Sequence, residues 1–453
     1  MSVLISKYNI PGPRYTSYPT VPYWDNGNFS LKEYKETLIK SFQESNTSEG
    51  ISLYIHLPFC ESLCTFCGCN KRITKNHTVE MPYLKAVLKE LSLYKTLLGE
   101  KPIIKQIHLG GGTPTFFTPE NLNFLIAGIF KIANKAEHCD FSFEGHPNNT
   151  TKAHLETLAK NGFTRVCYGV QDYNDTVQKA INRIQPFENV LNATKNARNA
   201  GYTSVGHDII YGLPFQTEAH VINTIEKTIE LAPDRIAFYS YAHVPWIKGN
   251  GQRGYKEENL PNAELKRLQY ETGKQLLLDA GYVEIGMDHF ALKTDSLYKA
   301  VKDQTIHRNF MGYSDSKTQV MIGLGVSAIS DSWYGFAQNV KSIEEYKNMI
   351  SDNLLPIFRG HILNSEDLII RKHILNLMCT FETSWEDDAL YFKELPEVLV
   401  KLEELKKDGL VTVLENKLVV TDEGRAFIRN ICLPFDLRLQ RNKPKTQLFS
   451  MTV

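Results

Sequence analysis

Cys60-Glu-Ser-Leu-Cys64-Thr-Phe-Cys67 places three cysteines on one short segment, directly after the apolar run Ile51–Leu57. That run is rich in β-branched and aromatic residues and ends at a proline, which predicts a β-strand followed by a loop. Structural zinc sites gather two separated pairs of ligands, and ferredoxin loops supply four thiolates at other spacings. Three thiolates on one loop can hold three irons of a 4Fe-4S cluster and leave the fourth iron open to a further ligand. The sequence therefore predicts a cluster that takes part in chemistry.

The other cysteines are spread along the chain. Cys69 follows the loop, whereas Cys139, Cys167, Cys379 and Cys432 stand singly, mostly in apolar segments, and are predicted to be buried core thiols. The N-terminal residues contain no secretory signal and no 18-residue apolar run is found nearby, so we expect a cytoplasmic protein without a membrane span. A disulfide framework is not expected in that compartment.

The composition limits the class of partner. The chain has 453 residues, 51 basic and 51 acidic side chains and 42% apolar residues, which excludes a disordered or coiled-coil protein. A net charge of zero provides no long-range field for nucleic acid or an anionic membrane. We therefore expect a small-molecule partner and no nucleic acid, and any anionic substrate must be held by locally placed cations.

Short β-branched runs alternate with longer amphipathic stretches, which is typical of βα units. After Ile51–Leu57, the predicted strands are 103–109, 141–144, 165–170, 204–210, 235–241 and 282–287. Seven strands in series predict a full or partial parallel (β/α) barrel of the TIM type. Each predicted strand is followed by glycine, proline or reactive side chains, as in HLGGGTP at 108–114, so the site is expected on the rim where the strands end.

We expect three parts: residues 1–47 as an N-terminal arm or lid, 48–345 as the catalytic barrel, and 346–453 as a mostly helical C-terminal domain. Within the last part, Leu410–Leu414 and Leu418–Val420 bracket a short turn and resemble a winged helix in outline. The helix before them has no basic face. A structural lid is therefore favoured over a nucleic-acid reader.

The C-x3-C-x2-C loop after the first strand, with Phe66 before its last cysteine, resembles the loop of the radical S-adenosylmethionine (SAM) superfamily. In that superfamily the open iron binds the amine and carboxylate of SAM, and reduction of the cluster cleaves the sulfonium to a 5′-deoxyadenosyl radical. The resemblance implies a barrel with the cluster on its rim.

Further motifs narrow the resemblance. They are RYTSYP at 14–19, CGCNK at 67–71, HLGGGTP at 108–114, GVQD at 169–172, YGLP at 211–214, GMDHF at 286–290 and HRNF at 307–310. Together they are similar to the oxygen-independent coproporphyrinogen III oxidase family over nearly the whole chain. Related haem chaperones share the cysteines and the GGGTP loop but typically lack the RYTSYP arm and the Gly68-Cys69 pair. A haem chaperone and a haem-degrading radical SAM protein remain the alternatives.

This resemblance implies a reaction, cofactors and partners. The family removes CO2 from two of the four propionates of coproporphyrinogen III, giving the vinyl groups of protoporphyrinogen IX without oxygen. The implied cofactors are a 4Fe-4S cluster and two molecules of SAM. We also expect a reductant such as flavodoxin or ferredoxin, and a monomer.

Carried over by position, the resemblance makes Cys60, Cys64 and Cys67 the cluster ligands, with Cys69 close by and not a ligand. It assigns the cluster-bound SAM to Tyr54, Gly111, Glu144 and Asp208, and a second SAM to Phe66, Gly112, Thr113, Gln171, Arg183, Ala242 and Ile329. The family often has an acidic or amide residue where this chain has His146, which we interpret as a neutral turn substitution.

A substrate with four carboxylates needs cations that do not quench a radical. The candidates on the arm and rim are Arg14, Lys71, Arg72 and Arg308, with Arg14 favoured because it lies in the RYTSYP arm. Tyr15 and Tyr18 of the same arm are expected to stack on the macrocycle.

Overall fold

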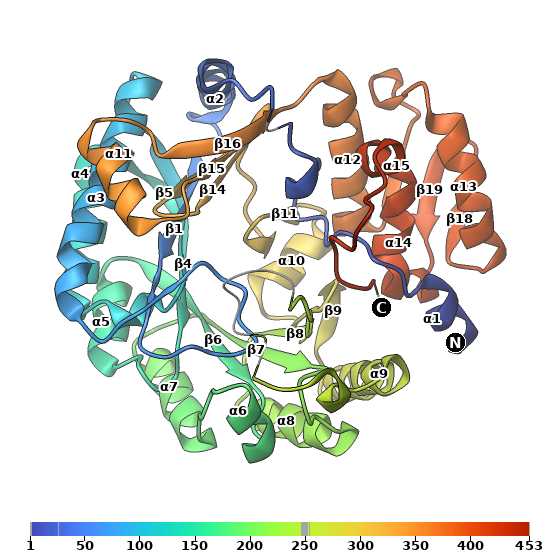
Figure 1. Ribbon diagram of the computed structural model, residues 1–453, viewed down its shortest axis with the longest axis horizontal. Helices are drawn as coiled ribbons and strands as arrows, with labels where there is room; N and C mark the ends of the chain where they lie inside the picture. The colour runs from blue at the N-terminus through green and yellow to red at the C-terminus, as the bar shows by residue number, and fades with distance from the viewer. Residues whose placement is uncertain (1, 26, 246–251, 253, 453) are drawn as a thin grey trace.

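In the computed structural model, the described residues are 2–25, 27–245, 252 and 254–452. Figure 1 shows a large sheet with helices around it on one side of the molecule, and a smaller, mostly helical part on the other side that contains both chain termini. The large sheet has twelve strands in the order β16-β15-β14-β13-β1-β4-β5-β6-β7-β8-β10-β9.

The centre of this sheet is parallel. Its strands follow the chain order and are β1 (Ile51–Leu57), β4 (Ile103–Gly111), β5 (Asn134–Gly145), β6 (Phe163–Gln171), β7 (Ser204–Tyr211) and β8 (Arg235–Ser240). β13 (Val320–Leu324) adds a further parallel strand beside β1. Six of the seven predicted strands are therefore confirmed as a parallel series, and their carboxyl ends lie on one rim.

The seventh prediction, a parallel strand at 282–287, is wrong in its direction. These residues form β9 (Val283–Gly286), which pairs antiparallel with β10 (His289–Ala291), and β10 in turn pairs antiparallel with β8. Only two residues separate β9 from β10, and a connection that short joins antiparallel strands. At the opposite edge, β14 (Ile329–Ser332), β15 (Gly335–Asn339) and β16 (Ile357–Ile362) are antiparallel too.

Helices cover the outside of the parallel strands (Figure 1). They are α3 (Glu80–Leu98), α4 (Pro119–Ile132), α5 (Lys152–Lys160), α6 (Asp175–Ala180), α7 (Phe187–Asn199), α8 (Glu218–Glu230) and α9 (Ala263–Asp279). Gly99 ends α3 in the left-handed conformation, and the Thr217 side chain caps α8. The apolar faces of strands and helices form one continuous core, with side chains such as Leu53, Ile107 and Val166 fully buried.

The second part of the molecule contains α12 (Ser365–Thr380), α13 (Leu395–Lys407), α14 (Ile428–Cys432), α15 (Leu437–Arg441) and a three-stranded sheet. The strands of that sheet are β17 (Glu382–Ser384), β18 (Val411–Val413) and β19 (Lys417–Val420), and the predicted hairpin is the antiparallel pair β18–β19. This agrees with the predicted helical domain that contains a winged-helix-like segment.

The N-terminal arm joins both parts of the fold. The arm begins with α1 (Ser2–Tyr8). The side chains of Tyr8, at the end of α1, and of Tyr15 and Tyr18, in the segment after it, lie in the apolar core of the C-terminal part. α2 (Leu31–Ser45) instead contacts the edge strands β15 and β16. The boundaries proposed at residues 47 and 345 stay a prediction.

Smaller elements complete the structure: α10 (Ser296–Lys302), α11 (Ile343–Ser351), β2 (Phe59–Cys60), β3 (Arg72–Ile73), β11 (His307–Asn309) and β12 (Gly312–Ser314). Among the described residues, no helix has both the length and the apolar character needed to cross a bilayer.

Candidate active site

A cavity of about 330 Å³ opens where the cysteine loop meets the carboxyl ends of β4 to β7. Of the predicted cofactor positions it is lined by Cys60, Cys64, Phe66, Cys67, Gly111, Gly112, Thr113, Glu144, Gln171, Arg183 and Asp208. The structure thus brings all but three of these positions to one cavity. The three outside its lining are Tyr54, Ala242 and Ile329.

The cysteine loop is held against the cavity by the neighbouring GGGTP loop. The Gly112 amide donates to Leu57 O at 2.8 Å, and the Thr113 amide donates to Phe59 O at 3.0 Å. A Cβ atom at Gly112 would lie 2.7 Å from the carbonyl carbon of Pro58, so only glycine allows the two loops to approach this closely. Gly112 of the GGGTP loop therefore sets how closely this loop approaches the cysteine loop.

The three loop cysteines are free thiols that face one cavity. Thr113 Oγ1 donates to Cys60 Sγ at 3.4 Å, and Arg183 Nη1 donates to Cys64 Sγ at 3.7 Å. A hydrogen bond from Cys69 is the main cause that lowers the pKa of Cys67 to about 6, while burial raises the pKa of Cys60 to about 11. In the described part of the chain, no group of three His, Cys, Asp or Glu residues is arranged to hold a single metal ion. Three thiols that face one cavity can hold three irons of a 4Fe-4S cluster.

Glu144 is the carboxylate at the end of β5 that faces this cavity. Its Oε2 accepts from the Gly111 amide at 3.2 Å, and its Oε1 lies 3.5 Å from His108 Nε2. Burial acts to raise the pKa of Glu144, but the hydrogen bond and charge of His108 and the Gly111 amide outweigh it, and the pKa lies below its usual value. Tyr54 stacks on His108 with ring centroids 6.1 Å apart. Tyr54 therefore supports Glu144 through His108 and does not line the cavity.

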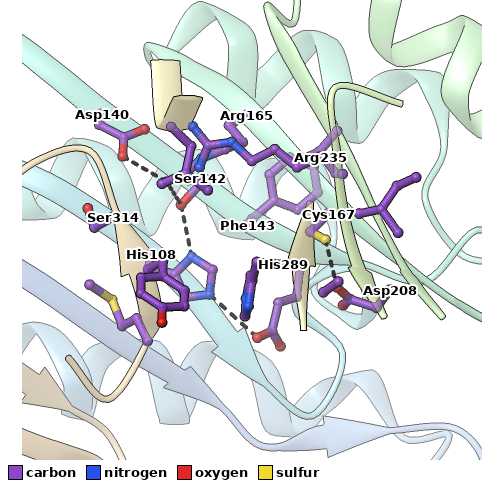
Figure 2. Close-up of a pocket in the computed structure, with 18 of the residues that line it drawn as sticks. His108, Asp140, Ser142, Phe143, Arg165, Cys167, Asp208, Arg235, His289 and Ser314 are labelled. Atoms are coloured by element: carbon purple, nitrogen blue, oxygen red, sulfur yellow. Dashed lines mark hydrogen bonds and ion pairs between the residues drawn. The ribbon is translucent and has the colours of Figure 1, made fainter. Parts of the chain in front are cut away.

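A second cavity lies inside the barrel and adjoins the first. Both are lined by Glu144, Cys167, Asp208 and Tyr239. Figure 2 shows its side chains, in which His108 Nδ1 lies 2.8 Å from Ser142 Oγ. Arg165 Nη2 donates to that hydroxyl at 3.1 Å and to Asp140 Oδ2 at 2.7 Å.

A chain of hydrogen bonds thus runs from Glu144 into the barrel. Sequence reasoning missed Asp140, Ser142 and Arg165. The alternation of Asp140, Ser142 and Glu144 along β5 could have found two of them, because every second side chain of a strand faces the same side.

The prediction that Cys167 is a core thiol is wrong. Cys167 lines both cavities, and its Sγ donates to Asp208 Oδ1 at 3.2 Å (Figure 2). Burial raises the pKa of Asp208 to about 7 and keeps the Cys167 thiol protonated by raising its pKa as well. The reason is its position on β6, which turns alternate side chains into the barrel.

His146 also lines the cavity. Its burial, together with the positive charge of Arg183, lowers the pKa of His146 to about 3. Its Nδ1 accepts from the Asn148 amide at 3.2 Å within the turn after β5. His146 is therefore a neutral residue of this turn.

The remaining cofactor positions, Ala242 and Ile329, do not line the cavity. The Ala242 carbonyl accepts at 3.0 Å from Gln252 Nε2, which also donates to the Phe66 carbonyl at 3.1 Å. Ile329 begins β14 and packs beside the buried cluster that includes Trp24. Their assignment to the second SAM stays a prediction.

The cations predicted to bind substrate already have protein partners in the structure. Arg14 Nη1 pairs with Asp288 Oδ2 at 3.0 Å, and its guanidinium carbon lies 6.0 Å from the ring centre of Tyr239. Arg308 is buried and donates to the carbonyls of Tyr15 and Arg14 at 3.4 and 3.3 Å, so it holds the arm. Of the other cations, Lys71 donates to the Cys67 and Cys69 carbonyls and Arg72 pairs with Glu344.

The expectation that Tyr15 and Tyr18 stack on a macrocycle is not supported. Both side chains are buried in the core of the C-terminal part, and the Tyr15 hydroxyl donates to Asp436 Oδ2 at 3.2 Å. Their apolar rings are already covered by the protein, which leaves no face for a ligand.

Comparison with known proteins agrees with this geometry. Residues 54–228 match the model of the radical SAM superfamily. The oxygen-independent coproporphyrinogen III oxidase of Synechocystis is 39% identical, over 99% of this chain and 97% of its own length. The Escherichia coli enzyme of the same name is 37% identical over 99% of this chain and 98% of its own length. This chain belongs to the oxygen-independent coproporphyrinogen III oxidase family.

A solved structure supports the membership. Coproporphyrinogen III oxidase from Escherichia coli, a radical SAM enzyme, superposes with a TM-score of 0.89 at 35% identity, covering 96% of this chain and 98% of that one. The predicted family and fold class are thereby confirmed. Membership of this radical SAM family implies a 4Fe-4S cluster and SAM as cofactors.

Proposed function

We propose that this chain catalyses the oxygen-independent oxidative decarboxylation of two propionates of coproporphyrinogen III, giving protoporphyrinogen IX in porphyrin and haem biosynthesis. The observation that carries this proposal is the single cavity that gathers Cys60, Cys64 and Cys67 with Glu144 and Asp208 in a member of this oxidase family. Each propionate would lose a hydrogen atom from its β-carbon to the radical, then CO2, and one electron to an external acceptor.

We assign Cys60, Cys64 and Cys67 as the ligands of the cluster. When bound and reduced, the cluster supplies the electron that cleaves the sulfonium of SAM to a 5′-deoxyadenosyl radical. The ionised Glu144 would accept hydrogen bonds from the ammonium of SAM, and Asp208 those of the ribose hydroxyls. The Gly111 backbone permits a close approach, and Tyr54 and His108 hold Glu144 in place.

We further propose a second SAM at Phe66, Gly112, Thr113, Gln171 and Arg183, with Ala242 and Ile329 beside them. Support comes from the first five, which line the same cavity. Arg183 Nη2 also donates to the Gly169 carbonyl at 2.8 Å, which fixes a cation near the thiols. We propose a flavodoxin-like or ferredoxin-like reductant, and a monomer.

Anaerobic turnover tests the proposed activity. Protein with a reconstituted cluster, given SAM, reductant and coproporphyrinogen III, is expected to release CO2 and to yield a tetrapyrrole with two vinyl groups. Clean SAM cleavage without CO2 would overturn the proposal. Stoichiometric haem binding with no conversion would instead indicate a trafficking protein, and a ring-opened product a haem-degrading enzyme.

The affinity for SAM is expected to fall as the pH drops below about 7. Burial raises the pKa of Asp208 to about 7, so acid protonates it and removes both its charge and an acceptor for the ribose. Above that pH the carboxylate is ionised and affinity reaches a plateau. Binding titrations of SAM to the cluster-loaded protein at pH 6 to 8.5 measure this, and Asp208→Asn should bind weakly at every pH. The exposed Asp303→Asn provides the control, and an unchanged pH profile in Asp208→Asn would contradict the assignment.

A further inference from the structure

A third cavity lies between the barrel rim, α9 and the C-terminal part, and it is lined by five cationic side chains. These are Arg14, Lys266, Arg267, Arg425 and Arg429. The carboxylates in its lining are Asp288 and Glu284. Tyr211 and Ser240, at the ends of β7 and β8, form its barrel side. The cavity is therefore strongly cationic in a protein whose net charge is zero.

Most of these charges already have partners. Arg14 pairs with Asp288 at 3.0 Å, Arg425 with Asp422 at 3.4 Å, and Arg267 with Glu271. Glu284 is neutralised by Lys274 from outside the cavity at 2.7 Å. These pairs leave Lys266 and Arg429 as the cations to be explained.

Lys266 and Arg429 have no carboxylate partner among the described residues. Lys266 Nζ donates to the Tyr241 carbonyl at 3.1 Å. Arg429 is 7% exposed and donates to the carbonyls of Gly12, Pro13, Ser450 and Met451 and to the Ser450 hydroxyl. Neutral acceptors satisfy their hydrogen bonds, and the carboxylate that attracts both charges, Asp288, is already paired with Arg14.

This arrangement carries an electrostatic cost. Burial and the positive charges of Arg14 and Arg429 lower the pKa of Lys266 to about 8, against the attraction of Asp288. A buried charge without a counterion is strongly disfavoured, and a bound anion removes that penalty. Arg and Lys side chains hold anions such as carboxylates through charge-assisted hydrogen bonds.

This cationic cavity shares no lining residue with the cysteine cavity or the barrel cavity. The Arg14 guanidinium lies over the Tyr239 ring, and Tyr239 lines both the cysteine cavity and the barrel cavity. A carboxylate beside Lys266 is thus outside the cavity that the predicted cluster ligands line. We therefore expect such a carboxylate to belong to a part of the ligand that is held in place and does not react.

We propose that Lys266, with Arg14 and Arg429, binds a propionate of the tetrapyrrole that is not decarboxylated. The inference rests on the proposed function, because coproporphyrinogen III has four propionates and two of them persist in the product. A site for a persisting propionate holds substrate, intermediate and product alike. It would fix the macrocycle while the other propionates are presented to the radical.

Binding of stable porphyrins tests this without turnover. Cluster-loaded protein with SAM and no reductant is titrated with coproporphyrin III, which has four propionates, and with mesoporphyrin IX, which has two. Lys266→Met is expected to raise Kd about tenfold for both ligands, because one charge-assisted contact is lost. Lys266→Arg should stay within about threefold of the unchanged protein. The control is Lys152→Met on α5, an exposed lysine that pairs with Glu156, and it should bind normally.

Two other outcomes of the porphyrin titrations would contradict the inference. Equal Kd values for Lys266→Met and the unchanged protein would show that the cavity does not hold a carboxylate. A loss confined to coproporphyrin III would assign the cavity to a reacting propionate. Normal iron content and normal SAM affinity show that a variant is folded. If Lys266→Met does not fold, Lys266→Gln takes its place. If the unchanged protein binds both porphyrins through Lys266 but releases no CO2, the proposed function fails while this site stands.

Discussion

Cys64→Ala is expected to lose the cluster and all measurable decarboxylation. Cys64 lies in the middle of the three-cysteine loop, and two thiolates cannot hold a four-iron cluster that already has one open iron. The measurement is iron and sulfide per chain after anaerobic reconstitution, followed by the CO2 assay. We expect iron to fall to a small fraction of four per chain and turnover to fall below detection.

Two matched cysteine variants control for loss of a thiol as such. Cys69→Ala removes a neighbour that is not expected to bind iron, and it should keep the cluster. Cys139→Ala removes a partly buried thiol that donates to the Ala136 carbonyl at 3.0 Å, and it should be nearly normal. If Cys64→Ala retained the cluster as well as Cys139→Ala does, the ligand assignment would be wrong.

Glu144→Gln is expected to weaken SAM binding by about 10- to 100-fold, the scale of losing hydrogen bonds to a charged group. Gln has the same size as Glu, but it lacks the negative charge that would face the SAM ammonium. The His108 and Gly111 contacts that hold the carboxylate ionised would also be weakened. Equilibrium titration of SAM under anaerobic conditions measures the effect, and turnover should fall in parallel.

The control for Glu144→Gln lies on the same strand. Glu137→Gln changes an exposed residue of β5 and should leave SAM affinity unchanged. Iron content must be normal in both variants, since neither residue is a predicted ligand. A Glu144→Gln protein with normal iron and normal SAM affinity would remove Glu144 from the cofactor site.

Much of the barrel and of its site follows from local sequence. The buried strands β1 and β4 to β8 are short β-branched runs, and the residues after them gather at one rim because parallel strands end together. The family resemblance assigned Glu144, Gly111 and Asp208 to the cofactor, and this arrangement of strands explains why they meet at one cavity. The direction of β9 could not, because an apolar run of that length fits a parallel or an antiparallel strand equally well.

The edge strands β13 to β16 and the cationic cavity were not predicted. The segment that forms β14 and β15 contains several serine, glycine and asparagine residues, which weaken the strand pattern. Arg14, Lys266 and Arg429 are far apart in the chain, and the packing of the arm and the C-terminal part against the rim brings them together. The same packing buries Tyr15 and Tyr18, whose aromatic character alone suggested a ligand contact.

The most direct test of the central claim is the transfer of deuterium from coproporphyrinogen III labelled at the β-carbons of its propionates. We expect anaerobic turnover to place deuterium in 5′-deoxyadenosine and to release CO2 from the same substrate, with a divinyl tetrapyrrole as the product. Unlabelled 5′-deoxyadenosine together with CO2 release would show that the radical does not attack this carbon. Labelled 5′-deoxyadenosine without CO2 or vinyl groups would contradict the proposed decarboxylation.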